Sequence, residues 1–306
     1  MAAIQGVPHP FPYQGSKRQL ASQIIQCIPS NTVTLIEPFA GSAAVTLAAA
    51  YLQKARRFVI NDIHEPLTEL WKAILSDPHA LAAGYRDLWT KQQGCEREFY
   101  DEVRDSFNKD HRPPEFLYLL ARCVKAAVRY NDKGEFNNSP DNRRKGMHPD
   151  AMEKNITFAS NLLRGKVRIS CQDYRVVLGL ATSSDVVYMD PPYQGVYNGQ
   201  DQRYYKGVPY EEFVDALDEL NKRDVPYVVS YDGRTGDKVH GRPLPEFLCL
   251  TRMEILVGRS TQATLLGRSH QTFESLYLSP KLLERLGHIP PIADHVTQSN
   301  LFAEAK

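Results

Sequence analysis

Cysteine is scarce in this sequence, and the few cysteines form no recognisable metal or disulfide pattern. Five are scattered along 306 residues, with no Cys-x-x-Cys pair. An odd, scattered set is typical of reduced thiols in a cytosol-like compartment, and it argues against a disulfide framework or a zinc site. The motif His-Glu-x-x-His is also missing. We therefore expect no bound metal.

Long apolar runs and a strong charge of either sign are missing as well. The stretch AAVTLAAAYL, residues 43–52, is too short and too rich in alanine to cross a bilayer. No charged segment followed by an apolar one begins the chain, so we expect no signal peptide. The formal net charge is +1, so a nucleic-acid surface must be a local patch. These features predict a soluble cytoplasmic protein with no membrane partner.

Strands alternate with helices in two parts of the chain. Residues 32–52 and 56–75 each show the order strand, turn, helix, and residues 166–193 and 210–233 continue the pattern. This alternation predicts right-handed βαβ units and an α/β fold with a parallel sheet. Residues 247–258 and 272–280 resemble paired strands joined by a polar loop. An antiparallel element is therefore expected at the end of the sheet.

A long polar segment separates these two parts. It is mostly helical in pattern and includes the loop-like run RYNDKGEFNNSPDNRRKGMHPD. A crossover between βαβ units does not need so many residues. We therefore predict an inserted helical subdomain at 66–165, an α/β domain from 1–65 and 166–285, and a C-terminal tail at 286–306.

The most informative motif is Asp190, Pro191, Pro192 and Tyr193, which follows a run of β-branched and aromatic residues. That run predicts a buried strand with the acid at its carboxyl end. The prolines fix the backbone and add no N–H donors, so the site offers only acceptors. Such acceptors suit a planar amino group on an aromatic ring. They localise its lone pair towards an electrophile while Tyr193 stacks on the ring.

Two further candidates follow predicted strands, and each has a structural alternative. The turn at 37–44 brings backbone close to a ligand, or serves only to pack a strand against a helix. Asp62 binds ribose hydroxyls, or caps the helix that follows. The motifs G-x-G-x-x-G and G-x-x-x-x-G-K-[ST] are absent. Their absence argues against a nicotinamide dehydrogenase and a P-loop enzyme.

Two more candidates carry weaker signals. Lys17 follows the flexible Gly15, where it meets a ligand carboxylate or begins a solvated helix. Asp173 and Tyr174 follow a predicted strand, where they bind an adenine amino group and ring or form a surface turn. The residues alone leave both alternatives open.

Six segments in this order resemble the DNA N6-adenine methyltransferases of the Dam-like (D12) class. They are PYQGSK, IEPFAGSAAV, INDIHEPL, RYNDKGEFN, CQDY and VVYMDPPY, and the match runs from about residue 10 to about residue 280. The resemblance implies a Rossmann-like methyltransferase sheet with a helical target-recognition insertion. It also implies S-adenosylmethionine as cofactor and S-adenosylhomocysteine as product.

The resemblance assigns roles to individual residues. The methionine portion of the cofactor would meet the N-terminal motif and the turn after the first strand, Asp62 would take the ribose and Asp173 and Tyr174 the adenine. The residues of the motif and the turn are Tyr13, Gly15, Lys17, Glu37, Pro38, Phe39 and Gly41. Asp190 to Tyr193 would grip the target base. In the insertion, Arg129, Tyr130 and Asn131 stand where the family meets DNA.

Three positions depart from the family pattern. Ala43 replaces the second glycine of the turn, and Ser16 replaces a glycine of the N-terminal motif. Tyr13 stands where an indole is common. We expect Ala43 to be tolerated if its φ stays negative. None of the three removes a predicted catalytic acceptor.

Positive charge is concentrated in the insertion. Residues 111–145 hold eight Lys or Arg and four acids, an excess of four positive charges. This is either a phosphate footprint or a solvated helical face. The predicted DNA-binding residues are Arg122, Arg129, Tyr130, Asn131, Arg143, Arg144 and Lys145. Asn131 and Arg129 have the chemistry to contact base edges.

These observations predict a site-specific enzyme that methylates N6 of an adenine flipped out of duplex DNA. We expect a monomer that belongs to a restriction-modification or related system and is functionally paired with a restriction endonuclease. DNA N4-cytosine methylation is the nearest alternative, although its tetrapeptide often begins with serine. RNA base methylation and a catalytically silent DNA-binding protein are further alternatives. The absence of a Pro-Cys dipeptide disfavours C5-cytosine chemistry.

Overall fold

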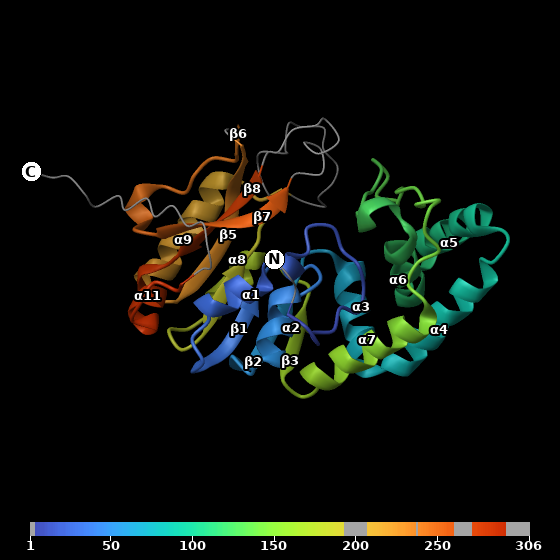
Figure 1. Cartoon of the computed structure of the whole chain (residues 1–306), viewed down its shortest axis with the longest axis horizontal. Helices are drawn as coiled ribbons and strands as arrows, with labels where there is room; N and C mark the ends of the chain where they lie inside the picture. Colours follow the sequence, from blue (N-terminus) through green and yellow to red (C-terminus); the bar gives the residue numbers. More distant parts are fainter. Residues whose placement is uncertain (1–3, 193–206, 237, 260–270, 292–306) are drawn as a thin grey trace, which may run out of the picture.

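One mixed sheet organises the computed structural model, which describes residues 4–192, 207–236, 238–259 and 271–291 (Figure 1). Its strands are β1 (Thr32–Glu37), β2 (Ala55–Asn61), β3 (Val167–Ser170), β4 (Val186–Met189), β5 (Tyr227–Thr235), β6 (Lys238–His240), β7 (Thr251–Arg259) and β8 (Gln271–Leu278). The strand order is β3-β2-β1-β4-β5-β8-β7, and β6 pairs with β5.

The sheet changes from parallel to antiparallel at β5. Strands β3, β2, β1, β4 and β5 pair in parallel, whereas β8 is antiparallel to both β5 and β7. The predicted α/β class and its antiparallel terminal element are confirmed. The strand order reverses between β1 and β4, so the loops that leave their carboxyl ends diverge. Ligands of open α/β sheets bind at such a switch point.

Both faces of the central strands are buried, because successive side chains enter different cores. Leu35 and Tyr188 belong to the core that contains α1 (Ala21–Ile24) and α2 (Ala44–Tyr51). Ile36 and Val187 belong to the core that contains α8 (Tyr174–Gly179) and α9 (Tyr210–Lys222). This two-sided burial explains the near-continuous apolar runs in the sequence.

The segment between β2 and β3 is mainly helical. It contains α3 (Glu65–Ser76), α4 (Pro78–Lys91), α5 (Glu96–Asp110), α6 (Pro113–Arg122) and α7 (Pro149–Leu163). Helices α4, α5 and α6 lie to one side of the sheet (Figure 1). Helix α7 packs on α2, α3 and α4, which connects this group to the sheet. The helical character agrees with the predicted insertion, and the division into domains stays a prediction.

A short helix near the end of the described chain was not predicted. Helix α11 (Pro280–Leu286) begins after Ser279, whose hydroxyl accepts a hydrogen bond from Leu282 N at 3.3 Å. Leu282 is fully buried and anchors the helix. The serine cap and the proline in the first turn are ordinary helix-start signals that the sequence interpretation left unused. Within the described ranges, no helix has the length and apolarity needed to span a membrane.

Candidate active site

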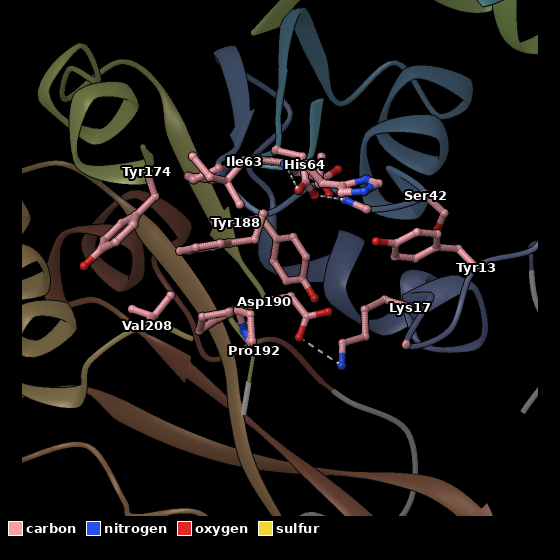
Figure 2. Close-up of a pocket in the computed structure, with 18 of the residues that line it drawn as sticks. Tyr13, Lys17, Ser42, Ile63, His64, Tyr174, Tyr188, Asp190, Pro192 and Val208 are labelled. Carbon is pink, nitrogen blue, oxygen red and sulfur yellow. Dashed lines mark hydrogen bonds and ion pairs between the residues drawn. The ribbon is translucent and has the colours of Figure 1, made fainter. Parts of the chain in front are cut away.

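A cavity of about 300 Å³ opens beside the switch point (Figure 2). This volume is at the lower end of the roughly 300–1,000 Å³ typical of small-molecule sites. Its lining includes every predicted cofactor residue together with Asp190, Pro191 and Pro192. These side chains come from the N-terminal segment and from the carboxyl ends of β1 to β4. Tyr193 lies outside the described residues.

Glycine is required at position 41 in the turn after β1. Gly41 has a φ of +50°, and a Cβ built there would lie 3.1 Å from the ring of Tyr13. Its N–H donates to Asp62 Oδ2 at 3.0 Å, and its carbonyl accepts from Trp71 Nε1 at 3.0 Å. The turn therefore lies close to Tyr13, and the N–H and the carbonyl of Gly41 are both hydrogen-bonded.

The two departures beside this turn have different structural consequences. Ala43 has a φ of +47°, so the condition for its ready tolerance, a negative φ, is not met. A residue with a Cβ is strained there by about 1–2 kcal/mol, and Ala43 offsets part of that strain by being fully buried. Ser16, in contrast, gains a contact that glycine lacks. Its hydroxyl accepts a hydrogen bond from Ser42 Oγ at 2.8 Å, which ties the N-terminal segment to the turn.

Asp62 connects the turns after β1 and β2. Besides the bond from Gly41, its Oδ1 accepts the N–H of His64 at 3.0 Å. His64 is the residue that precedes α3, and no side chain caps that helix. The helix-cap alternative for Asp62 is therefore not observed. Burial raises the pKa of Asp62, although backbone hydrogen bonds from His64, Gly41 and Ile63 oppose the rise.

Glu37 places a buried carboxyl group at the end of β1. Its Oε1 accepts a hydrogen bond from Thr46 N in the first turn of α2. Burial raises the pKa of Glu37 to about 8, the Asp190 carboxylate adds to the rise, and the bonds with Thr46 oppose it. The carboxyl group is therefore mostly protonated at neutral pH. A cation placed beside it would favour the charged form.

Asp173 and Tyr174 combine a structural role with a place in the cavity wall. Asp173 caps α8 by accepting a hydrogen bond from the backbone N–H of Arg175 at 2.9 Å. It also forms an ion pair with the Arg175 side chain. The Tyr174 ring lies 5.1 Å from that of Phe39, and together they form an aromatic wall. Among the described residues, the buried Tyr174 hydroxyl has no hydrogen-bond partner. The wall suits a flat, polar-edged ring.

A charged cluster surrounds Asp190 at the end of β4. Lys17 Nζ lies 3.1 Å from Asp190 Oδ1 and 2.9 Å from Glu274 Oε1. In Figure 2 the Lys17 side chain extends to Asp190 from the N-terminal segment. On β4, two residues before Asp190 in the sequence, the Tyr188 hydroxyl is 2.8 Å from Ser230 Oγ. Sequence interpretation missed Glu274, because no motif marks it and only the return of β8 brings it here.

His64 was also missed, and it connects the cavity to the predicted DNA loop. His64 lines the cavity, and its Nε2 lies 2.5 Å from the Tyr130 hydroxyl. Tyr130 pairs with Phe136 in a small hairpin. Within that hairpin Asn131 Oδ1 accepts from Lys133 N and Glu135 N. The Asn131 side chain thus shapes the turn in this structure.

The predicted basic residues of the insertion differ in exposure. Arg143 and Arg144 have side chains that are 85% and 74% exposed. Lys145 is also exposed and pairs with Glu96 at 2.7 Å. Arg122 is only 2% exposed and donates to the Glu96 carbonyl at 3.2 Å. Arg122 thus packs between α6 and the start of α5, and its predicted contact with a phosphate stays a prediction.

Curated relatives of this chain are methyltransferases. "Type II methyltransferase M.MjaIII" of Methanocaldococcus jannaschii is 33% identical over 60% of this chain and 68% of its own length. "DNA N-6-adenine-methyltransferase" of Escherichia phage P1 is 28% identical over 73% of this chain and 29% of its own length. "Retron Ec67 DNA adenine methylase" of Escherichia coli is 29% identical over 71% and 75%.

A family model gives the broadest match. Among solved structures, an rRNA methylase from Streptococcus thermophilus shows only a weak likeness, with a TM-score of 0.36 and 7% identity over 85% of this chain and 94% of that chain. The family model described as D12 class N6 adenine-specific DNA methyltransferase matches residues 13–279, most of the chain. The chain belongs to the D12 class of N6 adenine-specific DNA methyltransferases.

Proposed function

We propose that the protein transfers a methyl group from S-adenosylmethionine to N6 of an adenine flipped out of duplex DNA. The observation that carries this proposal is the shared cavity: Asp190, Pro191 and Pro192 line the same space as the turn at Gly41. An acceptor site for an amino group thus lies beside a site for a small polar ligand. The family match supports adenine and DNA as substrate.

The cavity residues fit the proposed cofactor. Glu37 and Asp62 offer carboxyl groups for an ammonium and for ribose hydroxyls, and both are buried. Phe39 and Tyr174 offer the aromatic wall for adenine, with the Tyr174 hydroxyl available to a polar edge. Tyr13 and Gly15 line the same cavity, and their proposed contact is with the methionine portion. When bound, the cofactor supplies an electrophilic methyl group on its sulfonium.

Asp190 has the central catalytic role in this proposal. Its carboxylate and a proline-held carbonyl accept the two N–H hydrogens of N6, which localises the lone pair on nitrogen. Fixed acceptors of this kind need no reorganisation during the reaction. Alignment of the reacting groups contributes roughly 7–11 kcal/mol. Flipping the base out of the duplex costs a few kcal/mol, and we propose that stacking on Tyr193 offsets part of that cost.

The insertion is proposed to hold the DNA. Exposed Arg143 and Arg144 carry positive charge that suits phosphates, and Lys145 adds to it. Arg129, Tyr130 and Asn131 form or flank the hairpin that His64 connects to the cavity. One transfer per binding event needs only a monomer. Two relatives are named Type II methyltransferases, which supports a restriction-modification role with a paired endonuclease; we propose that the protein acts in the cytoplasm.

One assay tests the reaction and its substrate. The protein is incubated with duplex DNA and methyl-labelled S-adenosylmethionine, and the DNA is digested to nucleosides. We expect label in N6-methyldeoxyadenosine. Label in N4-methyldeoxycytidine, or on RNA alone, would overturn the proposal. The N4-cytosine alternative is not favoured, because the family match is adenine-specific.

The role of Asp190 is tested by substitution. Asp190→Ala removes the acceptor and should abolish methyl transfer, whereas binding of S-adenosylhomocysteine should stay within about threefold of the wild type. Asp190→Asn keeps the shape but replaces one acceptor oxygen with an NH2 group, so it should be nearly as inactive. A methyl-transfer rate near that of the wild type in either variant would show that Asp190 does not hold the target amine.

A further inference from the structure

Glu274 has no role in the proposed reaction, yet its carboxylate and that of Asp190 both pair with Lys17. Lys17, in the short helix η1 (Lys17–Gln19), has Nζ within 2.9 Å of Glu274 Oε1 and 3.1 Å of Asp190 Oδ1. The three side chains are 10%, 13% and 19% exposed for Lys17, Glu274 and Asp190. They come from three distant parts of the chain. Their meeting point is therefore a product of the whole fold.

The sheet fixes the position of Glu274. On β8 it lies opposite Gly233 of β5 and Ile255 of β7. The register between β5 and β8 shifts between Ser230 and Gly233, immediately beside this pair. Such bulges re-aim side chains next to active sites. A side chain at position 233 would not fit, because its Cβ would lie 2.4 Å from the Phe273 carbonyl oxygen.

The contact between Glu274 and Lys17 is an ion pair. Oε1 lies at ion-pair distance but lacks the alignment of a hydrogen bond. Lys17 lines the cavity, whereas Glu274 reaches it only through Lys17. With both carboxylates present, one ammonium is divided between two negative groups. A lysine shared in this way withdraws less charge from Asp190 than an isolated ion pair would.

We propose that Glu274 is a positioning residue for methyl transfer, which holds the Lys17 ammonium where it orients Asp190 without neutralising it. The inference rests on the proposed function of Asp190. It differs from a plain stabilising role, for which a partly exposed ion pair contributes little. It also explains why Lys17 meets protein carboxylates here, in addition to its predicted contact with the cofactor.

Glu254 provides a matched control. It lies on β7, the strand next to β8, and its side chain is also 13% exposed. It pairs with Arg234 Nη2 at 3.0 Å and does not line the cavity. Glu274→Gln and Glu254→Gln therefore remove the same charge from neighbouring strands. Only the first change removes a carboxylate from Lys17.

The experiment compares the full-length wild type with Glu274→Gln, Glu274→Asp and Glu254→Gln. We measure kcat and KM for duplex DNA, the Kd of S-adenosylhomocysteine, and the melting temperature. For Glu274→Gln we expect kcat to fall about tenfold to a hundredfold, the scale of a misplacement of about 1 Å. The Kd should stay within about threefold. Glu274→Asp keeps the charge and should lie between the wild type and the Gln variant, and Glu254→Gln should keep the wild-type kcat.

Distinct results would overturn the inference and the proposed function. A kcat for Glu274→Gln within twofold of the wild type, or an equal loss in Glu254→Gln, would overturn the positioning role. If the Gln variant does not fold, a wild-type kcat for Glu274→Asp would do the same, and a lowered kcat with unchanged Kd would support the role. If the wild type itself places no label on N6 of adenine, the proposed function fails and this inference fails with it.

Discussion

Glu37 is expected to release a proton when the cofactor binds. Burial raises its pKa to about 8, so about 90% of the groups are protonated at pH 7. The proposed site places the ammonium of the methionine portion beside this carboxyl group. A neighbouring positive charge favours the carboxylate and lowers its pKa. We therefore expect release of about 0.9 proton for each molecule of S-adenosylhomocysteine bound at pH 7.

Calorimetry measures this proton directly. The observed binding enthalpy is plotted against the ionisation enthalpy of several buffers, and the slope is the number of protons exchanged. At pH 9.5 Glu37 is already ionised in the unliganded protein, so its own share of the exchange, taken as the difference between the wild type and Glu37→Gln, should fall below about 0.1 proton. Glu37→Gln should abolish the release at pH 7. The ligand 5′-methylthioadenosine, which has no amino-acid portion, should release none.

The Glu37→Gln variant separates the proton of Glu37 from those of other titrating groups that line the cavity. Burial lowers the pKa of His64 to about 3, so it is neutral throughout this range. Burial raises the pKa of Asp62, and the Glu37→Gln variant separates its contribution. Release below about 0.2 proton by the wild type at pH 7, or undiminished release by the variant, would refute the placement of the ammonium beside Glu37.

The same group gives the unliganded protein a pH-dependent stability. The folded-state pKa of about 8 lies above the ordinary 4.5, so the folded protein binds more protons than the unfolded chain between these values. The contribution of Glu37 to the free energy of unfolding must then fall as pH rises from about 4.5 to about 8. At about 1.36 kcal/mol per pH unit, the loss is at most about 5 kcal/mol. Denaturant titrations should show that the stability of the wild type relative to Glu37→Gln decreases as pH rises through this range.

Two further sets of substitutions test the turn and the DNA surface. Gly41→Ala should lower the free energy of unfolding by about 1–2 kcal/mol and weaken cofactor binding, because the new Cβ meets Tyr13 at 3.1 Å; an unchanged melting temperature would contradict this. Replacing Arg143 and Arg144 by alanine should lower the slope of log K against log salt by about 1.8, and an unchanged slope would exclude phosphate contacts. Arg122→Ala should reduce stability by about 1–3 kcal/mol.

Most of the cavity could be predicted because its residues follow parallel strands. Glu37, Asp62, Asp173 and Asp190 each stand at or just beyond the carboxyl end of a strand. In a parallel sheet those ends share one edge, so local patterns were enough to bring the four acids together. The runs of β-branched and aromatic residues likewise identified the strands themselves. No long-range contact had to be guessed.

Other features of the structure depend on contacts that no local sequence pattern records. Glu274 reaches Lys17 only because β8 returns antiparallel to β5. Arg122 is in a basic stretch, but the packing of α6 against α5 buries it. The left-handed backbone of Ala43 reflects the tight turn between β1 and α2, which a sequence with alanine at this position does not reveal.

The hydrogen bond between His64 and Tyr130 joins the wall of the cavity to the hairpin. A ligand that displaces the His64 ring breaks this hydrogen bond and so changes the support of the hairpin. A DNA duplex that moves Tyr130 breaks the same bond and so changes the wall of the cavity. Two ligands that act on one shared element are bound to be thermodynamically linked. If the cofactor changes the affinity for DNA by some factor, DNA changes the affinity for the cofactor by the same factor.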